Sequence, residues 1–263
     1  MTSKLHIALI QSDLVWENPE ANRLAFSEKI NDLPKNTDLI ILPEMFTTGF
    51  TMNAHPYAET MQGETVTWMQ QLAQQKNAAI VGSTIIKEEV ENEVNYFNRL
   101  LFVHPTGDIE FYDKKHTFTL ANEHTVYTAG TKKIHIDYKG WKICPLICYD
   151  LRFPAWARNT DYYDVLLYVA SWPKPRINAW DALLKARAIE NMSYTIGVNR
   201  VGTDGLNFEY SGNSVVYDTL GNCLAKKDNG EDTVLMVEID KEQQETLRTK
   251  FSFLEDRDLF VIQ

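Results

Sequence analysis

The 263-residue chain lacks several features that would assign it to a familiar class of protein. It has three cysteines, an odd number without framework spacing, so we expect free thiols rather than disulfides. No apolar run is long enough to span a bilayer, and no hydrophobic signal segment follows residues 1–4. The sequence therefore predicts a cytoplasmic protein without a membrane anchor.

Positive charge is also scarce. Lysine and arginine together number 26 against 36 acidic residues, which gives a net charge of -10. This balance argues against nucleic acid or an anionic membrane surface as the main partner. Repeats, low-complexity tracts and linkers are lacking too. We therefore expect a single domain over residues 1–263, in which residues 241–263 form a C-terminal helix and tail.

Apolar periodicity and turn residues predict strands that alternate with helices. Strands are expected at residues 5–11, 38–42, 78–86, 95–104, 109–112, 133–137, 141–147, 165–170, 195–200, 213–217, 222–226 and 233–239. Helices are expected from Asn18-Pro19 to Leu33, at 64–76, at 155–159, from an Asn178 cap to Asn191, and at 241–250. The pattern indicates an α/β protein with mixed sheets covered by helices.

Three reactive side chains stand at the ends of predicted strands. They are Glu44, Lys114 and Cys148. A thiol can attack a carbonyl or nitrile carbon, a carboxylate can take its proton, and an ammonium group can stabilise an oxyanion. Because Cys148 precedes a turn that could open a helix, we expect the helix N-terminus to acidify its thiol.

These residues lie in motifs that resemble those of the nitrilase superfamily, the carbon–nitrogen hydrolases. The resemblance extends in chain order from residue 5 to residue 238. The matching segments are Leu42-Pro43-Glu44-Met45-Phe46, Tyr112-Asp113-Lys114-Lys115-His116, Ile147-Cys148-Tyr149-Asp150-Leu151-Arg152-Phe153-Pro154, Ala170-Ser171-Trp172-Pro173, Arg187-Ala188-Ile189-Glu190-Asn191, Asn199-Arg200 and Ser211-Gly212-Asn213-Ser214.

The resemblance implies a four-layer αββα sandwich with two mixed β-sheets, assembled as a homodimer or a higher homo-oligomer. It also implies a Glu-Lys-Cys triad. Glu44 would be the general base, and Cys148 the nucleophile that forms a thioester. Lys114 and the backbone N–H of Tyr149 would hold the oxyanion. Glu123 matches a second glutamate that orients the lysine in related amidases. No cofactor or metal is expected.

The substrate class also comes from resemblance. Residues 46–50 and 121–124 are most similar to the ω-amidases, which hydrolyse 2-oxoglutaramate or 2-oxosuccinamate to the 2-oxo acid and ammonia. Nitrilases and N-carbamoyl or β-ureido acid hydrolases share the triad, so they stay open as alternatives.

A substrate that carries a carboxylate needs a cation in the pocket of this acidic protein. Arg176 is our candidate, because it follows a stiff proline-rich loop. Lys115 and Arg152 are weaker candidates, since each could serve the fold. Three aromatic residues are expected to form the pocket walls: Phe46, Phe118 and Trp172.

Other classes explain fewer residues. A cysteine protease would pair Cys148 with His116 or His124, which leaves the carboxylate and the ammonium group without a role. A zinc site formed by Cys144, Cys148, His116 and His124 would have poor ligand spacing. A catalytically silent scaffold would be expected to lose a member of the triad, and all three are present.

Overall fold

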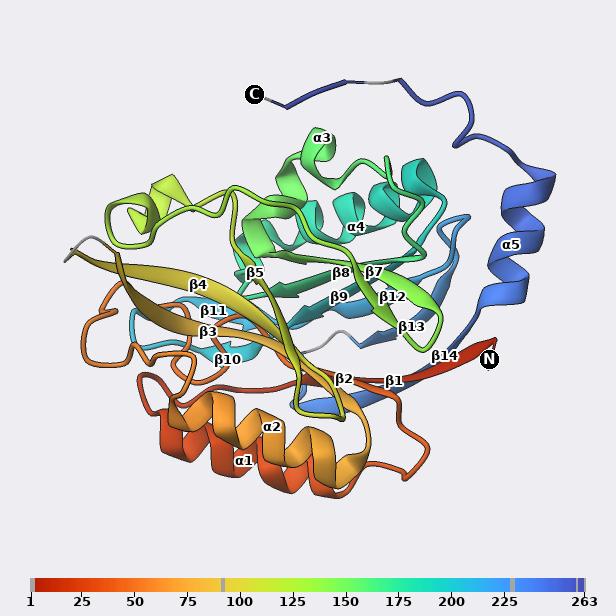
Figure 1. The fold of residues 1–263 in the computed structure, drawn as a ribbon. Helices are drawn as coiled ribbons and strands as arrows, with labels where there is room; N and C mark the ends of the chain where they lie inside the picture. The colour runs from red at the N-terminus through yellow and green to blue at the C-terminus, as the bar shows by residue number, and fades with distance from the viewer. Residues whose placement is uncertain (1–2, 91–92, 228–229, 259, 263) are drawn as a thin grey trace.

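The computed structural model describes residues 3–90, 93–227, 230–258 and 260–262. Two six-stranded sheets pack face to face, and helices cover the outer face of each (Figure 1). This arrangement confirms the predicted four-layer αββα sandwich. In the described part of the chain, no helix is both long enough and apolar enough to cross a bilayer.

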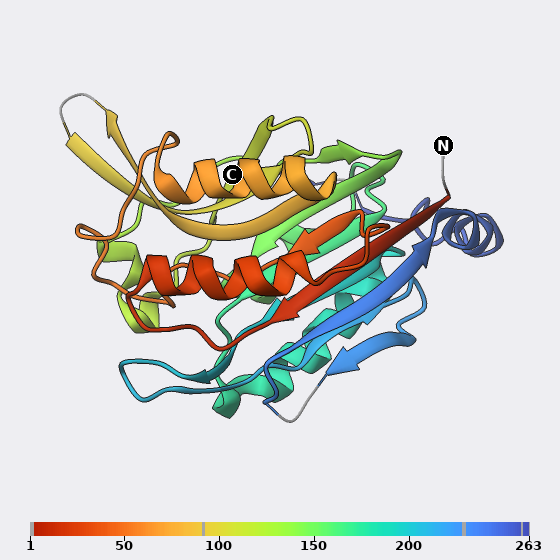
Figure 2. The ribbon, with the colours of Figure 1, turned by 90° about the horizontal axis from the view of Figure 1, so that it is seen from below.

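The first sheet contains the N-terminal half of the chain and one strand from its C-terminal part. In the order β14-β1-β2-β3-β4-β5, its strands are Thr233–Asp240, Lys4–Gln11, Leu39–Ile41, Ala79–Val90, Glu93–Val103 and Ile109–Asp113. The strands β1, β2 and β3 are parallel, and the other pairs are antiparallel. Helices α1 (Pro19–Asn31) and α2 (Glu64–Lys76) lie across its outer face (Figure 2).

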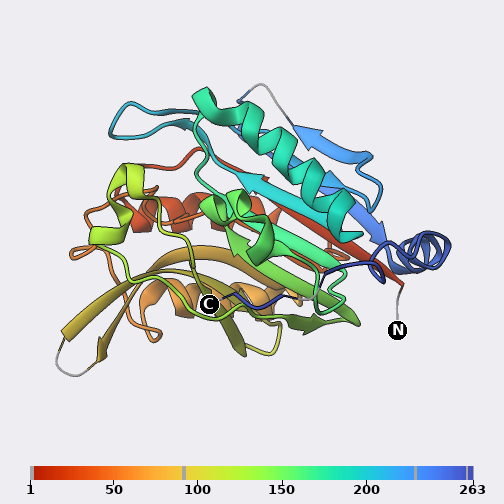
Figure 3. The same ribbon diagram turned by 90° about the horizontal axis from the view of Figure 1, so that it is seen from above.

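The second sheet is built from strands that lie between residues 136 and 227. In the order β13-β12-β9-β8-β7-β6, its strands are Cys223–Lys227, Ser214–Tyr217, Tyr194–Asn199, Val165–Ala170, Trp141–Ile147 and Ile136–Tyr138. Helices α3 (Pro154–Ala157) and α4 (Ile177–Asn191) cover its outer face, and α5 (Lys241–Lys250) lies at one end (Figure 3). A small hairpin pairs β10 (Val201–Thr203) with β11 (Glu209–Ser211).

Central parallel strands explain why part of the sequence shows no alternation. All six residues of β8 are buried, since β7 and β9 pair with it in parallel and both of its faces are covered. The N-terminus of α1 follows the predicted signal. The side chain of Asn18 accepts a hydrogen bond from the backbone N–H of Ala21 at 3.1 Å, and Pro19 occupies the first turn.

Some predicted boundaries were wrong. Helix α4 begins at Ile177, so Asn178 lies inside it and does not cap it. The chain enters this helix directly from a 3₁₀ turn, η4 (Lys174–Arg176). The predicted strand at 133–137 is the shorter β6, shifted toward the turn, and the predicted helix at 155–159 is the single turn α3. The β10–β11 hairpin was not predicted.

Candidate active site

Four strand ends from the two sheets meet at one place. Glu44 follows β2 after a Leu-Pro turn, and Lys114 directly follows β5, both in the first sheet. Cys148 directly follows β7 and Ser171 directly follows β8, both in the second sheet. The structure thus brings together the three predicted reactive residues at the edge where the sheets face each other.

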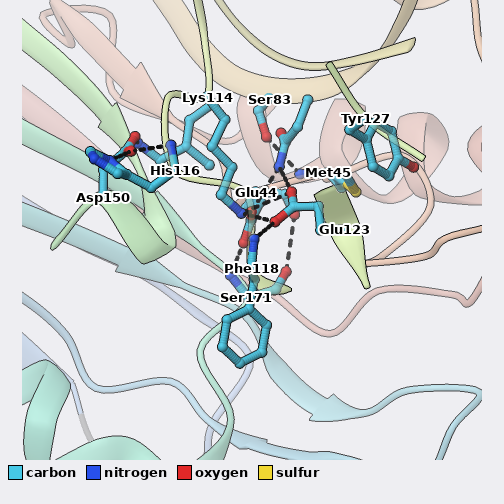
Figure 4. A network of polar contacts seen from close by, with 12 residues as sticks. Glu44, Met45, Ser83, Lys114, His116, Phe118, Glu123, Tyr127, Asp150 and Ser171 are labelled. Atoms are coloured by element: carbon cyan, nitrogen blue, oxygen red, sulfur yellow. Dashed lines mark hydrogen bonds and ion pairs between the residues drawn. The ribbon is translucent and has the colours of Figure 1, made fainter. Parts of the chain in front are cut away.

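Glu44 is fully buried and is held from both sheets. Its Oε2 accepts a hydrogen bond from the backbone N–H of Ser171 at 2.8 Å. Its Oε1 accepts from Lys114 Nζ and from the side-chain amide of Asn98, each at 2.8 Å. One positively charged donor and two neutral N–H donors therefore hold the carboxylate in one orientation (Figure 4).

Lys114 lies between two carboxylates. Its Nζ is 2.8 Å from Glu44 Oε1 and 2.9 Å from Glu123 Oε2 (Figure 4). Burial by itself would lower the pKa of Lys114, but the charges of Glu123 and Glu44 outweigh it and raise the pKa, so the amine is an ammonium ion. The structure thus places the predicted second glutamate directly against the lysine.

Glu123 begins a 3₁₀ turn, η2 (Glu123–Thr125), and is itself fully buried. Its Oε2 also accepts the backbone N–H of Phe118 at 2.5 Å, which ties the loop to the lysine. Burial raises the pKa of Glu123, as does the charge of Glu44, while Lys114 opposes the rise.

Cys148 is the first residue of a 3₁₀ turn, η3 (Cys148–Arg152), and its φ is 44°, in the left-handed region. This conformation costs a non-glycine residue about 1–3 kcal/mol and is typical of functional sites. Burial raises the pKa of the Cys148 thiol well above its usual range. Glu44 raises it further, and Lys114 opposes the rise. The expectation of an acidified thiol was therefore wrong: the turn is short, and at rest the sulfur keeps its proton beside Glu44.

A buried carboxylate joins the lysine segment to the nucleophile turn. Asp150 Oδ1 accepts hydrogen bonds from the backbone N–H of His116 at 3.0 Å and is 2.7 Å from its Nδ1. Its Oδ2 accepts from the Tyr112 hydroxyl at 2.8 Å and from the backbone N–H of Ile147 at 3.0 Å. Asp150 thereby fixes the position of Lys114 relative to Cys148, a role that the sequence did not reveal.

A cavity of about 240 Å³ opens onto the sulfur of Cys148. Of the predicted substrate-binding residues, the structure places Phe118, Trp172 and Arg176 in its lining, together with Tyr149, whose backbone N–H was predicted to hold the oxyanion. Further lining comes from residues that were not predicted to bind the substrate: Phe50, Met52, Leu120, Ala121, Ser171, Pro173, Asp204, Leu206, Phe208 and Tyr210.

Phe46 does not line this cavity, so that prediction was wrong. Its ring is fully buried on the helical side of the first sheet, 5.6 Å from the ring of Phe26 and 5.7 Å from that of Trp68. The reason is the backbone at Met45, where φ is 44°. This turn directs Glu44 toward the second sheet and sends Phe46 back into its own helical layer.

The cavity holds two of the three candidate cations. Arg176 lies with its guanidinium 5.1 Å from the ring centre of Phe118, and Arg152 lies 5.0 Å from that of Trp172. Lys115 instead approaches the ring of Trp156 outside the cavity lining, with 5.6 Å between Nζ and the ring centre. Both arginines are thus available to an anionic group of a ligand.

Comparison with known proteins agrees with this geometry. Residues 6–249 match the family model for carbon–nitrogen hydrolases, so the chain belongs to the carbon–nitrogen hydrolase family. Omega-amidase YafV of Escherichia coli (strain K12) is 43% identical over 256 residues, covering 97% of this chain and 98% of that protein.

Two further relatives extend the comparison. The 2-oxoglutaramate amidase of Bacillus subtilis (strain 168) is 31% identical, covering 98% of this chain and 100% of that protein. The crystal structure of XC1258 from Xanthomonas campestris, a CN-hydrolase superfamily protein with an arsenic adduct in its active site, superimposes with a TM-score of 0.94. It is 40% identical in sequence and covers 99% of both chains.

Proposed function

We propose that this protein is an ω-amidase that hydrolyses the terminal amide of a short 2-oxo acid, such as 2-oxoglutaramate or 2-oxosuccinamate. The observation that carries the proposal is the cavity itself. Its lining contains the thiol of Cys148 and the ammonium group of Lys114, which pairs with the carboxylates of Glu44 and Glu123. Two arginines, Arg152 and Arg176, also line it. The names of the relatives agree with this substrate class.

The first half of the reaction forms a thioester. Glu44 takes the proton of Cys148, and the sulfur attacks the amide carbon. Lys114 and the backbone N–H of Tyr149 bind the oxygen that gains the negative charge. Glu44 then returns the proton to the amide nitrogen, and the C–N bond breaks to release ammonia. The raised pKa of the Cys148 thiol makes this base necessary, since little thiolate exists without it.

The second half consumes one water molecule. Glu44 removes a proton from the water, the hydroxide adds to the thioester carbon, and the sulfur leaves and regains its proton. The products are the 2-oxo dicarboxylate and the free thiol. Glu123 keeps Lys114 oriented in both halves, because its two oxygens lie 3.0 and 2.9 Å from Nζ.

The decisive experiment is a panel of amides, nitriles and N-carbamoyl compounds with ammonia release as the readout. We expect the highest kcat/KM for an ω-amide of a 2-oxo acid. The Cys148→Ala variant provides the background. A clear preference for nitriles would favour a nitrilase, and a preference for β-ureido acids would favour a carbamoyl hydrolase. Either result would overturn the ω-amidase proposal.

Arg176 is the proposed partner of the substrate carboxylate. We expect Arg176→Ala to raise KM for 2-oxoglutaramate about 10- to 100-fold with a smaller change in kcat, because a charged hydrogen bond to the substrate is lost. Steady-state kinetics measure both constants. Lys115→Ala is the matched control, since Lys115 lies outside the cavity lining. An unchanged KM in Arg176→Ala, with a raised KM in Arg152→Ala, would assign the contact to the other arginine.

We also infer that the chain works as one hydrolase domain in the cytoplasm, as a homodimer or a larger homo-oligomer. Exposed apolar residues of the C-terminal tail, such as Phe253 and Val261, support an interface there. Sedimentation velocity at micromolar concentration is expected to show a species larger than the monomer. A single monomer peak would contradict the assembly.

A further inference from the structure

Asn98 occupies a position in the site that the mechanism above does not use. It lies in β4, and only 1% of its surface is exposed to solvent. Its side-chain amide nitrogen, Nδ2, lies 2.8 Å from Glu44 Oε1 and 3.3 Å from Glu123 Oε1. Its backbone oxygen accepts the N–H of Lys114 at 3.1 Å. One asparagine therefore contacts both carboxylates through its side chain and the backbone of Lys114 through its own backbone.

Electrostatics fixes which way this amide points. If the side chain were flipped, its oxygen would face two carboxylates, which is repulsive, so Nδ2 must point toward them. This orientation is unfavourable for the other polar atom of the amide, the oxygen Oδ1. Within the described part of the chain, Asn98 Oδ1 is buried without a hydrogen-bond partner. An orphaned buried oxygen is unfavourable, so the two donated hydrogen bonds must be worth keeping.

We propose that Asn98 is a positioning residue that keeps Glu44 and Glu123 ionised side by side, with Lys114 as their shared cation. The inference rests on the proposed function, because it concerns the protonation of the base that activates Cys148. Two buried carboxylates with one ammonium group carry an excess negative charge. The amide supplies one hydrogen to each carboxylate, and hydrogen bonds donated to a carboxylate favour its charged form.

The charged and titratable groups around Glu44 come from several elements. Lys114 follows β5, Glu123 begins η2, and Cys148 begins η3. Two tyrosines also sense the charge of Glu44, Tyr127 after η2 and Tyr210 in β11, and burial is the main reason why the pKa of each is raised. Of these groups only Lys114 is a cation. The side chain of Asn98 and the backbone N–H of Ser171 are the neutral donors that supplement it at Glu44, and Asn98 also donates to Glu123.

The test is the pH dependence of Cys148 alkylation by iodoacetamide, followed by mass spectrometry of the modified peptide. This readout needs no substrate. Asn98→Leu keeps the size of the side chain but removes both donors. We expect the alkylation rate to begin its fall toward low pH about one unit higher than in the wild type, because the carboxylate pair loses two donated hydrogen bonds that favour its charged form. At a pH within this fall, the rate is about 10-fold lower than in the wild type.

At pH values above this fall, the variant and the wild type are expected to react at similar rates, since the variant changes only the acid side of the profile. Asn95→Leu is the matched control. It lies in the same strand, is only partly buried, and its side chain accepts a hydrogen bond from Thr128 Oγ1 at 3.1 Å, away from the site. If Asn98→Leu melts far below the wild type, Asn98→Ala provides the same readout with less steric demand.

The outcomes separate the possible roles. A parallel fall in rate at every pH would mean that Asn98 only supports the fold, and an unchanged profile would mean that it has no role; either result overturns the inference alone. If Cys148 of the wild type showed no selective alkylation, the proposed function would fall too. A second check uses Glu123→Gln, which removes the carboxylate repulsion. In that background, Asn98→Leu is expected to shift the fall toward low pH less.

Discussion

Replacing Cys148 with alanine is expected to lower kcat for amide hydrolysis by about 10⁶-fold, as removal of a catalytic nucleophile does in other hydrolases. No other described residue in the cavity lining carries a thiol, and the carboxylate of Glu44 is held by three hydrogen bonds that fix it as a base rather than as a nucleophile. Loss of the sulfur therefore removes the covalent route altogether. Ammonia release from 2-oxoglutaramate measures the effect.

Two controls make this result specific. Cys223→Ala changes a free cysteine that is exposed, far from the strand ends of the site, and is expected to retain full activity. The thermal midpoint of Cys148→Ala should stay near that of the wild type, because alanine meets the same left-handed backbone requirement as cysteine. An activity above one part in a thousand of the wild type would mean that Cys148 is not the nucleophile.

Replacing Lys114 with methionine is expected to reduce both activity and stability. The variant leaves two buried carboxylates without their cation, which we expect to lower the free energy of unfolding by about 3–5 kcal/mol at neutral pH. Since the ammonium group also faces the oxyanion position, kcat should fall by about 10³-fold or more. Urea unfolding and steady-state kinetics measure the two effects.

The stability that Lys114→Met loses is expected to depend on pH in one direction. Burial and the charge of Glu44 raise the pKa of Glu123 in the folded protein, so the folded state binds more protons than the unfolded state, and stability falls as pH rises through the glutamate range. Without Lys114 this fall is steeper. The variant should therefore be closer to the wild type at pH 5 than at pH 7.5. A difference that is the same at both pH values would contradict the buried cluster.

Matched variants isolate the cause. Lys115→Met removes the neighbouring lysine, which lies outside the cluster, and should change stability little. Adding Glu123→Gln to Lys114→Met removes one of the unpaired charges and is expected to restore much of the lost stability, though not the activity. Recovery of stability without recovery of activity would separate the structural from the catalytic contribution of the lysine.

The sequence located the reactive residues because each one directly follows an apolar strand or its turn. Strand ends that carry Glu44, Lys114 and Cys148 can be recognised from local patterns, and so can the loop that carries Arg176. The position of Phe46 could not be recognised in this way, since it depends on a left-handed backbone at Met45, and a methionine gives no signal for that conformation. The same holds for the protonation of Cys148, which burial decides.

Asn98 illustrates a signal that was present but weak. A polar amide in an apolar strand is disfavoured, and its neighbours Leu100 to Val103 are all buried, so it stands out as a residue that needs a reason. Its partners, however, lie on segments distant in sequence, and only the fold brings them together. The β10–β11 hairpin was missed because each strand has three residues, too few for a periodic pattern.

The position of β1 has a consequence for how the protein is made. β1 is an inner strand of its sheet, paired with β2 on one side and on the other with β14, where Lys4 faces Asp240. During synthesis, β1 leaves the ribosome before the other strands of its sheet and must wait for β14, the last of them, with one edge open. The base and the nucleophile come from different sheets, so the sulfur meets Glu44 only after distant parts of the chain have met. Non-local pairing of this kind slows folding, and it also means that an unfinished chain carries no assembled hydrolase.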